Sequence, residues 1–391
     1  MPSVEYRLFF NNTAATREQL DRVDEITVEQ EMDMAWEAQI QVPICTDERG
    51  QWSSQDEAFL REFSRVRVEI KVGKGGFLPL IDGPIVEVQD QLNSQPGESL
   101  KTIRVQDDSV YLNREDEIVR HENQLDHEIA QQLLQGVEQI ASIDVETTPS
   151  PTSSLPPVVM QRETRMQLLR SFARRHPDFH AYVLPGTESG ASIGCFKKFP
   201  EQLDGLPDLV LLGGDRNLST FTPQYDAQSP ATASTAFLSL TDRTVTQRQA
   251  DPATVTPLGG SLASPRTTTP ATRILPPSYG DGMDVDQAVN TSTTVSSFAY
   301  GATGQVLGEC YSGVLSPYRL ITVRGANELL SGTYQITRVS HSLTRSNYAQ
   351  SFTLRRNSRS DRPPANNNSG GVGAIAAASV TVSFNIQGSI F

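Results

Sequence analysis

The first chemistry to consider is metal binding by two histidines and a cysteine. His176 and His180 are four residues apart, and Cys195 follows them in the chain. A zinc site with this spacing needs both histidines on one face of a regular helix, together with further ligands. Pro177 stands between the two histidines and would break such a helix. The sequence therefore predicts no metal site, and we expect the protein to work without a cofactor.

The residues that could serve acid–base or nucleophilic catalysis are a histidine and two runs of carboxylates. His341 lies in the middle of a predicted strand, and no nucleophile with supporting spacing stands nearby, so we expect a packed or hydrogen-bonded structural histidine. The carboxylate runs at Asp107–Asp108 and at residues 115–117 are interpreted as solvated turns. A glycosidase needs two carboxylates that face each other across a cleft, and the sequence alone does not place such a pair. No catalytic residue is predicted.

Binding of phosphate or nucleic acid is also disfavoured. Residues 73–76 are glycine-rich but lack the spacing and the Lys-Ser/Thr ending of a phosphate loop, so they predict a hairpin turn. Arg174–Arg175 and Lys197–Lys198 together suggest a basic face. Because the net charge is −13, we expect that face to contact another protein subunit and predict no stable binding to nucleic acid or membrane.

Length and composition describe a globular chain. With 391 residues, 37% of them hydrophobic and 20% charged, the chain can hold two or three domains. The cysteines Cys45, Cys195 and Cys310 are odd in number and far apart, which favours a reducing compartment. The N-terminus shows no signal peptide, and no apolar run has membrane-spanning length. We therefore expect synthesis and assembly in the cytoplasm.

The first region, residues 1–112, is rich in predicted strands. Residues 36–42 and 66–72 alternate strictly between apolar and polar side chains, which is typical of half-buried strands. Residues 52–65 predict a short helix. Several strands with one covering helix predict a small barrel or sandwich.

The second region, residues 113–190, changes to helical spacing and is here called the insert. Asn123 is a candidate N-cap for a helix that ends near Gly136, and a second helix is expected over residues 164–175, where Pro177 ends it. A linker rich in Pro, Ser and Thr separates them at residues 147–157, and a strand is predicted over residues 179–183. These elements predict a compact α/β domain.

The third region, residues 191–358, returns to strand character, with its apolar centre at residues 209–212. Within it, residues 224–297 are rich in Pro, Ser, Thr and Ala and have little apolar periodicity, so we expect them to hold little core of their own.

The last region, residues 359–391, combines a flexible linker with one predicted strand. Val380, Val382, Phe384 and Ile386 share one face of that strand, which has no partner within its own segment. We expect it to add to the sheet edge of a neighbouring protein, which makes these four residues the candidate partner interface.

Residues 331–356 predict a β-hairpin with an irregularity in its first strand. Apolar side chains alternate over residues 334–336 and again over 339–343, but with opposite parity. A slip of one residue near Thr337 is what a β-bulge produces. Residues 344–347 supply a polar turn before the alternation resumes.

The motifs of this hairpin resemble a known family. A glycine and a tyrosine, an alternating strand, Val-x-His, a polar turn and Phe-x-Leu-x-Arg follow one another as in the closing hairpin of the phage late-control D family. Those proteins are baseplate hubs of contractile phage tails and related injection systems. Weaker matches follow the family's order over residues 5–356, at residues 26–40, 80–86, 105–114 and 161–173.

The resemblance implies a mainly β fold with an α/β insert and two tube-like β-barrels in tandem, formed by residues 1–112 and 191–358. It also implies a homotrimer that joins a six-fold inner tube to a three-fold spike and contacts other baseplate proteins. No spike-like repeat follows Arg356, so the spike is expected to be a separate protein. The expected function is structural, in a virion tail or an injection particle.

Two alternatives belong to other functional classes. One is a cell-wall hydrolase of the baseplate, which would need a dedicated catalytic domain that the sequence does not display. The other is a receptor-binding protein at the particle tip, which only the Pro/Thr-rich residues 224–297 support.

Overall fold

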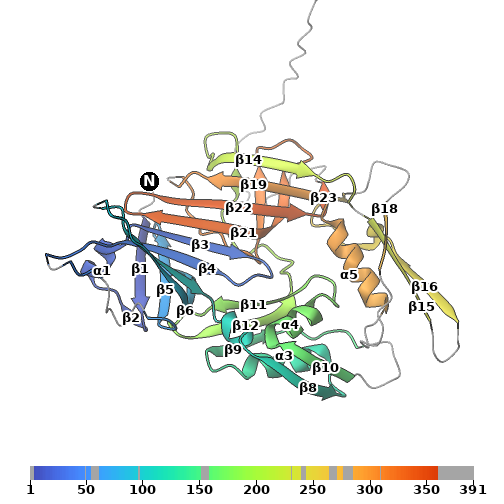
Figure 1. Ribbon diagram of the computed structural model, residues 1–391. Helices are drawn as coiled ribbons and strands as arrows, with labels where there is room; N and C mark the ends of the chain where they lie inside the picture. Colours follow the sequence, from blue (N-terminus) through green and yellow to red (C-terminus); the bar gives the residue numbers. More distant parts are fainter. Residues whose placement is uncertain are drawn as a thin grey trace, which may run out of the picture.

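The computed structural model describes residues 4–48, 50–53, 61–95, 97–150, 158–229, 231–238, 244–263, 271–275, 285–308 and 310–359. The fold over these residues is mainly β, with helices concentrated in the insert and beside the sheet (Figure 1). The mainly β class with an α/β insert is therefore confirmed. None of the helices in the described ranges is long and apolar enough to cross a membrane.

One curled, 13-stranded sheet runs through both the first and the third regions. Its neighbouring strands, in spatial order, are β14 (Leu218–Tyr225), β19 (Tyr300–Val306), β22 (Tyr348–Arg356), β21 (Gly332–Thr344), β3 (Glu25–Glu31), β4 (Glu37–Pro43), β7 (Leu100–Gln106), β6 (Leu78–Gln91), β5 (Arg65–Val72), β1 (Val4–Phe10) and β2 (Thr13–Ala14). Off this path, β20 (Leu320–Arg324) pairs with β21 and with β13 (Leu209–Val210).

The antiparallel pairing of β21 with β3 is the seam that joins the two regions. It runs from Arg338 opposite Glu31 to Thr344 opposite Glu25. Because of this pairing, the strands of the two expected barrels belong to one sheet. Within the described residues, neither region closes into a barrel of its own.

The strands form where the sequence alternates. Ala38, Ile40 and Val42 point into the core, whereas the glutamate and glutamines between them lie on the other face of β4. The same two-residue period puts Val66, Val68 and Ile70 of β5 in the core. A second cluster under β19–β22 includes Ile336, Val339, Phe352 and Leu354.

The closing hairpin has the predicted irregularity. β21 and β22 pair antiparallel, with a register shift between Ile336 and Arg338 that leaves Thr337 as the extra residue. The strands turn over residues 344–347, where the Thr344 N–H donates to the Asn347 carbonyl at 2.9 Å. The hairpin, its bulge and its turn are confirmed.

The insert packs helices α3 (Asp126–Gln135) and α4 (Arg165–Ala173) on a three-stranded sheet. Its strands β11 (Phe179–Pro185) and β9 (Ile140–Val145) flank β12 (Ser192–Lys198), which the first residues of the third region supply. Thr164 caps α4 by accepting from the Gln167 N–H. A separate ribbon pairs β8 (Asp116–Glu122) with β10 (Val158–Thr164), and the short helix α2 (Ser109–Leu112) precedes it. In Figure 1 the insert lies below the large sheet.

The region rich in Pro, Ser, Thr and Ala forms what we call the arm. It comprises β15 (Ala231–Leu238), β16 (Val245–Ala250) and β18 (Ala271–Ile274), with α5 (Val285–Ser297) packed on them. In Figure 1 the β15–β16 hairpin projects from the right of the molecule, away from β1 and β2. Of the remaining short elements, α1 (Arg17–Arg22) lies near the N-terminus, η2 (Pro252–Thr254) lies beside α5, and β17 (Ser261–Leu262) pairs with β23 (Ser358–Arg359). Residues 54–60, half of the helix predicted over residues 52–65, lie outside the described residues. The described part of that range is not helical, since Trp52 pairs with Thr46 in an isolated bridge, residues 61–63 form a turn and Arg65 begins β5.

Candidate functional site

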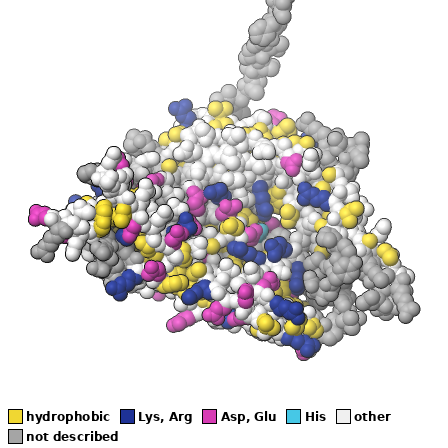
Figure 2. Space-filling model, in the orientation of Figure 1, with side chains coloured by type: hydrophobic (Ala, Val, Ile, Leu, Met, Phe, Trp, Pro, Cys, Tyr) yellow, Lys and Arg dark blue, Asp and Glu magenta, His cyan; other side chains and the backbone are white. Residues whose placement is uncertain are grey.

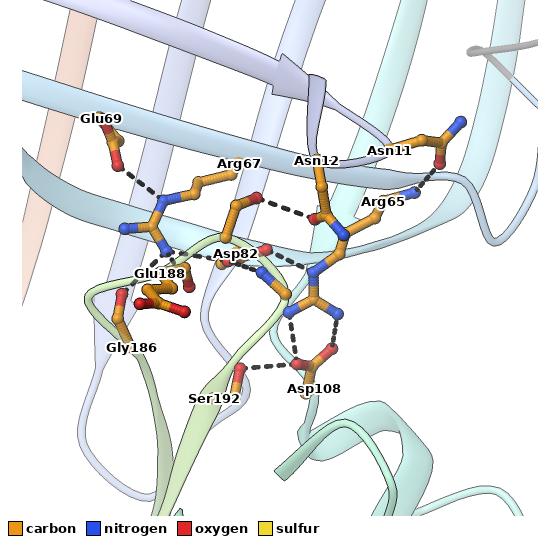
Figure 3. Close-up of polar contacts among 12 residues, drawn as sticks. Asn11, Asn12, Arg65, Arg67, Glu69, Asp82, Asp108, Gly186, Glu188 and Ser192 are labelled. Carbon is orange, nitrogen blue, oxygen red and sulfur yellow. Dashed lines mark hydrogen bonds and ion pairs between the residues drawn. The ribbon is translucent and has the colours of Figure 1, made fainter. Parts of the chain in front are cut away.

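A buried cluster of charged side chains lies where the insert meets the large sheet. Arg65 and Arg67 come from β5, Asp82 from β6, and Asp108 from the start of α2 (Figure 3). The side chains of Asp82 and Asp108 are fully buried, and that of Arg67 is 1% exposed. Such charges are stable in a protein interior only when they are paired and hydrogen-bonded.

Arg65 joins the two aspartates. Its Nε donates to Asp82 Oδ1 at 2.6 Å, and its two Nη atoms donate to Asp108 at 3.0 and 2.7 Å. Burial alone would lower the pKa of Arg65, but the carboxylates of Asp108 and Asp82 outweigh it and raise the pKa. Arg65 therefore stays charged, and the two-pronged contact fixes Asp108 in one orientation.

Arg67 clamps the turn of the insert between β11 and β12. It pairs with Asp82 at 2.9 Å and donates to the carbonyls of Gly186, Thr187 and Glu188 at 2.8–3.1 Å (Figure 3). The Gly190 N–H donates to Asp82 Oδ2 at 3.0 Å.

The clamped turn needs glycine at two positions. A Cβ at residue 186 would lie 1.9 Å from the Ala191 carbonyl oxygen, and Gly190 has a φ of +86°. Ser192 completes the site by donating to Asp108 at 2.6 Å. The cluster thus fixes the position of the insert, and its carboxylates are engaged by arginines, a serine hydroxyl and a backbone N–H.

The sequence interpretation missed this cluster. Arg67 lies between Val66 and Val68 in an alternating strand, and such alternation by itself places the polar side chain on the face away from the core. The turn between β11 and β12 that contacts Arg67 is more than a hundred residues away in the chain, so no local sequence pattern predicts the contact. The two neighbouring arginines on one strand were the available signal.

The solvated turn predicted at Asp107–Asp108 was wrong, whereas Glu115 and Asp116 are exposed as expected. Asp107 and Asp108 are buried, because Asp107 accepts from the Trp36 N–H at 2.6 Å while Asp108 pairs with Arg65. Burial raises the pKa of Asp107 to about 6. Glu117 is not a free surface charge either, since it pairs with Arg165 at 2.8 Å, and this ion pair lowers its pKa.

His341 is built into the seam of the sheet. Its Nδ1 lies 2.8 Å from the Tyr348 hydroxyl and its Nε2 lies 3.3 Å from Gln30 Oε1, and the side chain is fully buried. Burial lowers the pKa of His341 to about 3, so the ring is neutral at physiological pH. The structural role predicted for this histidine is confirmed by these contacts.

The two histidines of the insert serve different contacts. His176 Nε2 lies 2.9 Å from Asp126 within the insert, whereas His180 Nδ1 reaches Asp33 in the turn between β3 and β4 at 3.0 Å. Cys195 lies on β12, and burial raises its pKa to about 12, so it stays a thiol. No group of three or more His, Cys, Asp or Glu side chains suited to a metal occurs among the described residues.

The expected basic face is largely neutralised by ion pairs. Arg175 pairs with Asp126, Lys197 with Asp144, and Lys198 lies 3.9 Å from Glu146. The glycine-rich residues 73–76 form the turn between β5 and β6, as predicted.

The outward face of the seam is polar. The central strands present Ser, Thr, Gln and paired charges there, such as Arg338 with Glu29 at 3.0 Å and Arg104 with Glu87 at 2.6 Å. None of the exposed large hydrophobic side chains of the described residues lies on β3, β4, β7, β21 or β22. In Figure 2 the surface over β19 and β22 is mostly neither charged nor hydrophobic. This face suits contact with water or with a hydrophilic surface.

Val380, Val382, Phe384 and Ile386, the predicted partner interface, lie outside the described residues, as does the linker before them.

Comparison with known proteins identifies the fold. No protein-family model and no curated protein matches the sequence. The structure is similar to the tail protein from Neisseria meningitidis MC58, with a TM-score of 0.59 and 10% identity over 93% of this chain and 100% of that one. It is similar also to the 43 kDa tail protein of prophage MuSo2 from Shewanella oneidensis, with a TM-score of 0.61 and 12% identity over 90% of this chain and 98% of that one.

A third similar structure is the E. coli c3393 protein, a component of the type VI secretion system that itself resembles the T4 bacteriophage tail proteins gp27 and gp5. The TM-score is 0.53, with 13% identity over 92% of this chain and 79% of that one. At such identities the likeness establishes the fold. The tail-protein fold that the closing hairpin predicted is therefore confirmed.

Proposed function

We propose that the chain is a structural, non-enzymatic baseplate hub of a contractile phage tail or a related injection particle. The observation that carries the proposal is the likeness of the whole chain to whole tail proteins: more than nine-tenths of each chain aligns in the Neisseria comparison, and at least 90% in the Shewanella one. A protein that shares an entire fold with tail components, and not one domain of it, fits an architectural role.

The contacts of the buried and half-buried carboxylates support a structural role. Asp82, Asp108 and Glu117 are paired with arginines, and Asp107 accepts backbone hydrogen bonds. A catalytic acid–base pair would need carboxylates that reach a substrate. These side chains hold elements of the chain against one another instead.

In the proposed particle three copies form a ring between the six-fold inner tube and a separate three-fold spike. Residues 1–112 and 191–358 act as two tube-like units, residues 113–190 as the insert between them, and residues 359–391 as a tail. Six such units in a trimer match the symmetry of the tube. The curled sheet, continuous through the seam, supplies a stiff wall for this purpose.

The tail of the chain is proposed to dock the spike. Val380, Val382, Phe384 and Ile386 would add as a strand to an open sheet edge of the spike protein, or of another baseplate protein.

Native mass spectrometry tests both the trimeric hub and the docking of the spike by the tail. The chain is co-expressed for this purpose with the inner tube and spike proteins of its own particle. We expect a complex with three copies of this chain and three of the spike protein. A variant that ends before Ala374 should keep the trimer and lose the spike. Retention of the spike by that variant would refute the docking role, and a complex that never contains three copies would refute the hub itself.

A further inference from the structure

Three parts of the chain meet at His180. It lies on β11 of the insert, its ring faces Asp33 in the turn between β3 and β4, and Tyr318 from the loop before β20 packs against it with ring centroids 5.6 Å apart. The side chain of His180 is only 8% exposed. A change of charge on this residue therefore acts on the contact between the insert and both halves of the sheet.

Both ring nitrogens of His180 face carboxylates. Nδ1 lies 3.0 and 3.1 Å from the two oxygens of Asp33, whereas Nε2 makes no hydrogen bond within the described part of the chain and lies 3.6 Å from Asp178 Oδ1, within the distance of an ion pair. In a neutral ring that donates from Nδ1 to Asp33, the lone pair of Nε2 would face the negative charge of Asp178, whereas the imidazolium presents a positively charged N–H to each carboxylate. The surroundings therefore match the charged ring.

The backbone around His180 is held in an unusual conformation. Asp33, Asp178 and Tyr318 have φ values of +60°, +58° and +61°, in the left-handed region that favours glycine. The Asp33 N–H donates to the Tyr318 hydroxyl at 2.7 Å, which ties two of these residues together. Such conformations persist only where surrounding contacts maintain them, and they concentrate at clamps and switches.

The remaining neighbours of His180 extend the network. Asp178 also lies 3.6 Å from Arg355 of β22, whose Nε donates to Gln335 at 2.8 Å and whose guanidinium lies over the ring of Phe298. Tyr182, two residues along β11, stacks on Tyr318 with ring centroids 3.6 Å apart, and Phe199 packs against His180. Burial raises the pKa of Tyr318, and from farther away the charge of Asp107 raises it as well, whereas the charge of Arg170 lowers it. Asp33, Asp178, Tyr318 and Arg355 are thus the charged and titratable groups around this histidine.

We propose that His180 is a proton-controlled latch, which in its charged form holds the insert against the turn between β3 and β4 and loosens that contact when it loses its proton. This inference concerns the chain itself and does not depend on the proposed hub function.

The direction of the pH effect follows from the surroundings. Burial alone would lower the pKa of His180, but Asp178 and Asp33 outweigh burial and raise it. A base whose pKa is higher in the folded than in the unfolded protein stabilises the fold when it is protonated. For histidine this stabilisation is present at pH values below the pKa of the unfolded chain, about 6.5. That stabilisation is lost as the pH rises through the folded pKa. The latch is therefore closed at pH 6 and loosened at alkaline pH.

A double-mutant cycle on the full chain tests the latch. His180→Gln, Asp33→Asn and the double variant are compared with the unmodified chain by thermal unfolding at pH 6 and at pH 9. We expect a coupling between the two substitutions of about 2 °C in Tm at pH 6 and none at pH 9. The matched control pairs His180→Gln with Glu31→Gln, because Glu31 lies two residues from Asp33 but contacts Arg338 instead. No coupling is expected in the control at either pH.

Two outcomes would overturn the latch: a coupling of equal size at both pH values, or none at pH 6. Should His180→Gln fail to fold, Asp33→Asn alone remains informative. Its Tm penalty must shrink between pH 6 and pH 9, and a constant penalty contradicts the proposal.

Discussion

Different interactions stabilise the large sheet and the arm. Around the seam, Ile26, Val28 and Ile40 are almost completely buried, and burial of apolar surface stabilises by about 25 cal/mol per Å². In the arm, α5 meets its strands through small and hydroxyl-bearing side chains, and Val289 is its one large buried apolar residue among those described. The sheet thus has a core of its own, whereas the arm depends on single hydrogen bonds.

In those hydrogen bonds, side-chain hydroxyls donate to backbone carbonyls. Ser296 Oγ donates to Ala231, Thr293 Oγ1 to Ala250, and Thr291 Oγ1 to Arg175 of the insert, at 2.9–3.3 Å. Each such bond contributes only about 0.5–1.5 kcal/mol net. The sheet is therefore suited to form a rigid wall, and changes in the arm should leave the sheet folded.

The largest effect is expected from breaking the buried charge cluster beside the sheet. Arg67→Ala should lower the free energy of unfolding by about 3–5 kcal/mol, because Asp82 would keep its charge with one partner fewer. This loss is measured by unfolding both proteins in urea and monitoring the transition by circular dichroism. The matched control in the arm is Arg248→Ala, which breaks the exposed pair with Asp286 and should change stability by less than about 0.5 kcal/mol. Equal losses in the two variants would contradict the contrast between the regions.

Acid should weaken the sheet through its seam. The pKa of His341 is about 3 in the folded protein because the ring is buried, against about 6.5 in an unfolded chain. The unfolded state therefore binds a proton that the folded state does not, and stability falls by about 1.4 kcal/mol per pH unit as the pH drops below 6.5. Because of His341, the free energy of unfolding should be about 2 kcal/mol lower at pH 5 than at pH 7. In His341→Gln this contribution should vanish, and an unchanged pH dependence would show that another group causes it.

The smallest effect is expected in the arm. Ser296→Ala removes a hydroxyl that bonds to the backbone of β15, and it should cost about 1 kcal/mol. Since the arm has little core, the loss should appear as faster hydrogen exchange in α5 and β15 with almost no change in Tm. Faster exchange across β21 and β3 as well would mean that arm and sheet unfold as one unit.

The same contrast explains what the sequence could predict. The alternation around Ile40 identified β4, and the change of parity at Thr337 identified a bulge, because both signals are local. Asp107, Asp108 and Arg67 were misassigned because their partners are brought to them by folding. The seam between β21 and β3 joins residues about 300 positions apart, so no local pattern could reveal that the two regions share one sheet. The strands of the arm were not predicted, since its Ser, Thr and Ala residues show little periodicity.

The mass of the purified chain in solution, measured by light scattering after size-exclusion chromatography, shows whether the chain forms the trimer that a hub requires. A hub with three-fold symmetry predicts three times 42.9 kDa, or about 129 kDa, which should persist when the residues from Ala374 onward are removed. A stable dimer or tetramer would refute the hub function, because neither can join a three-fold spike to a six-fold tube.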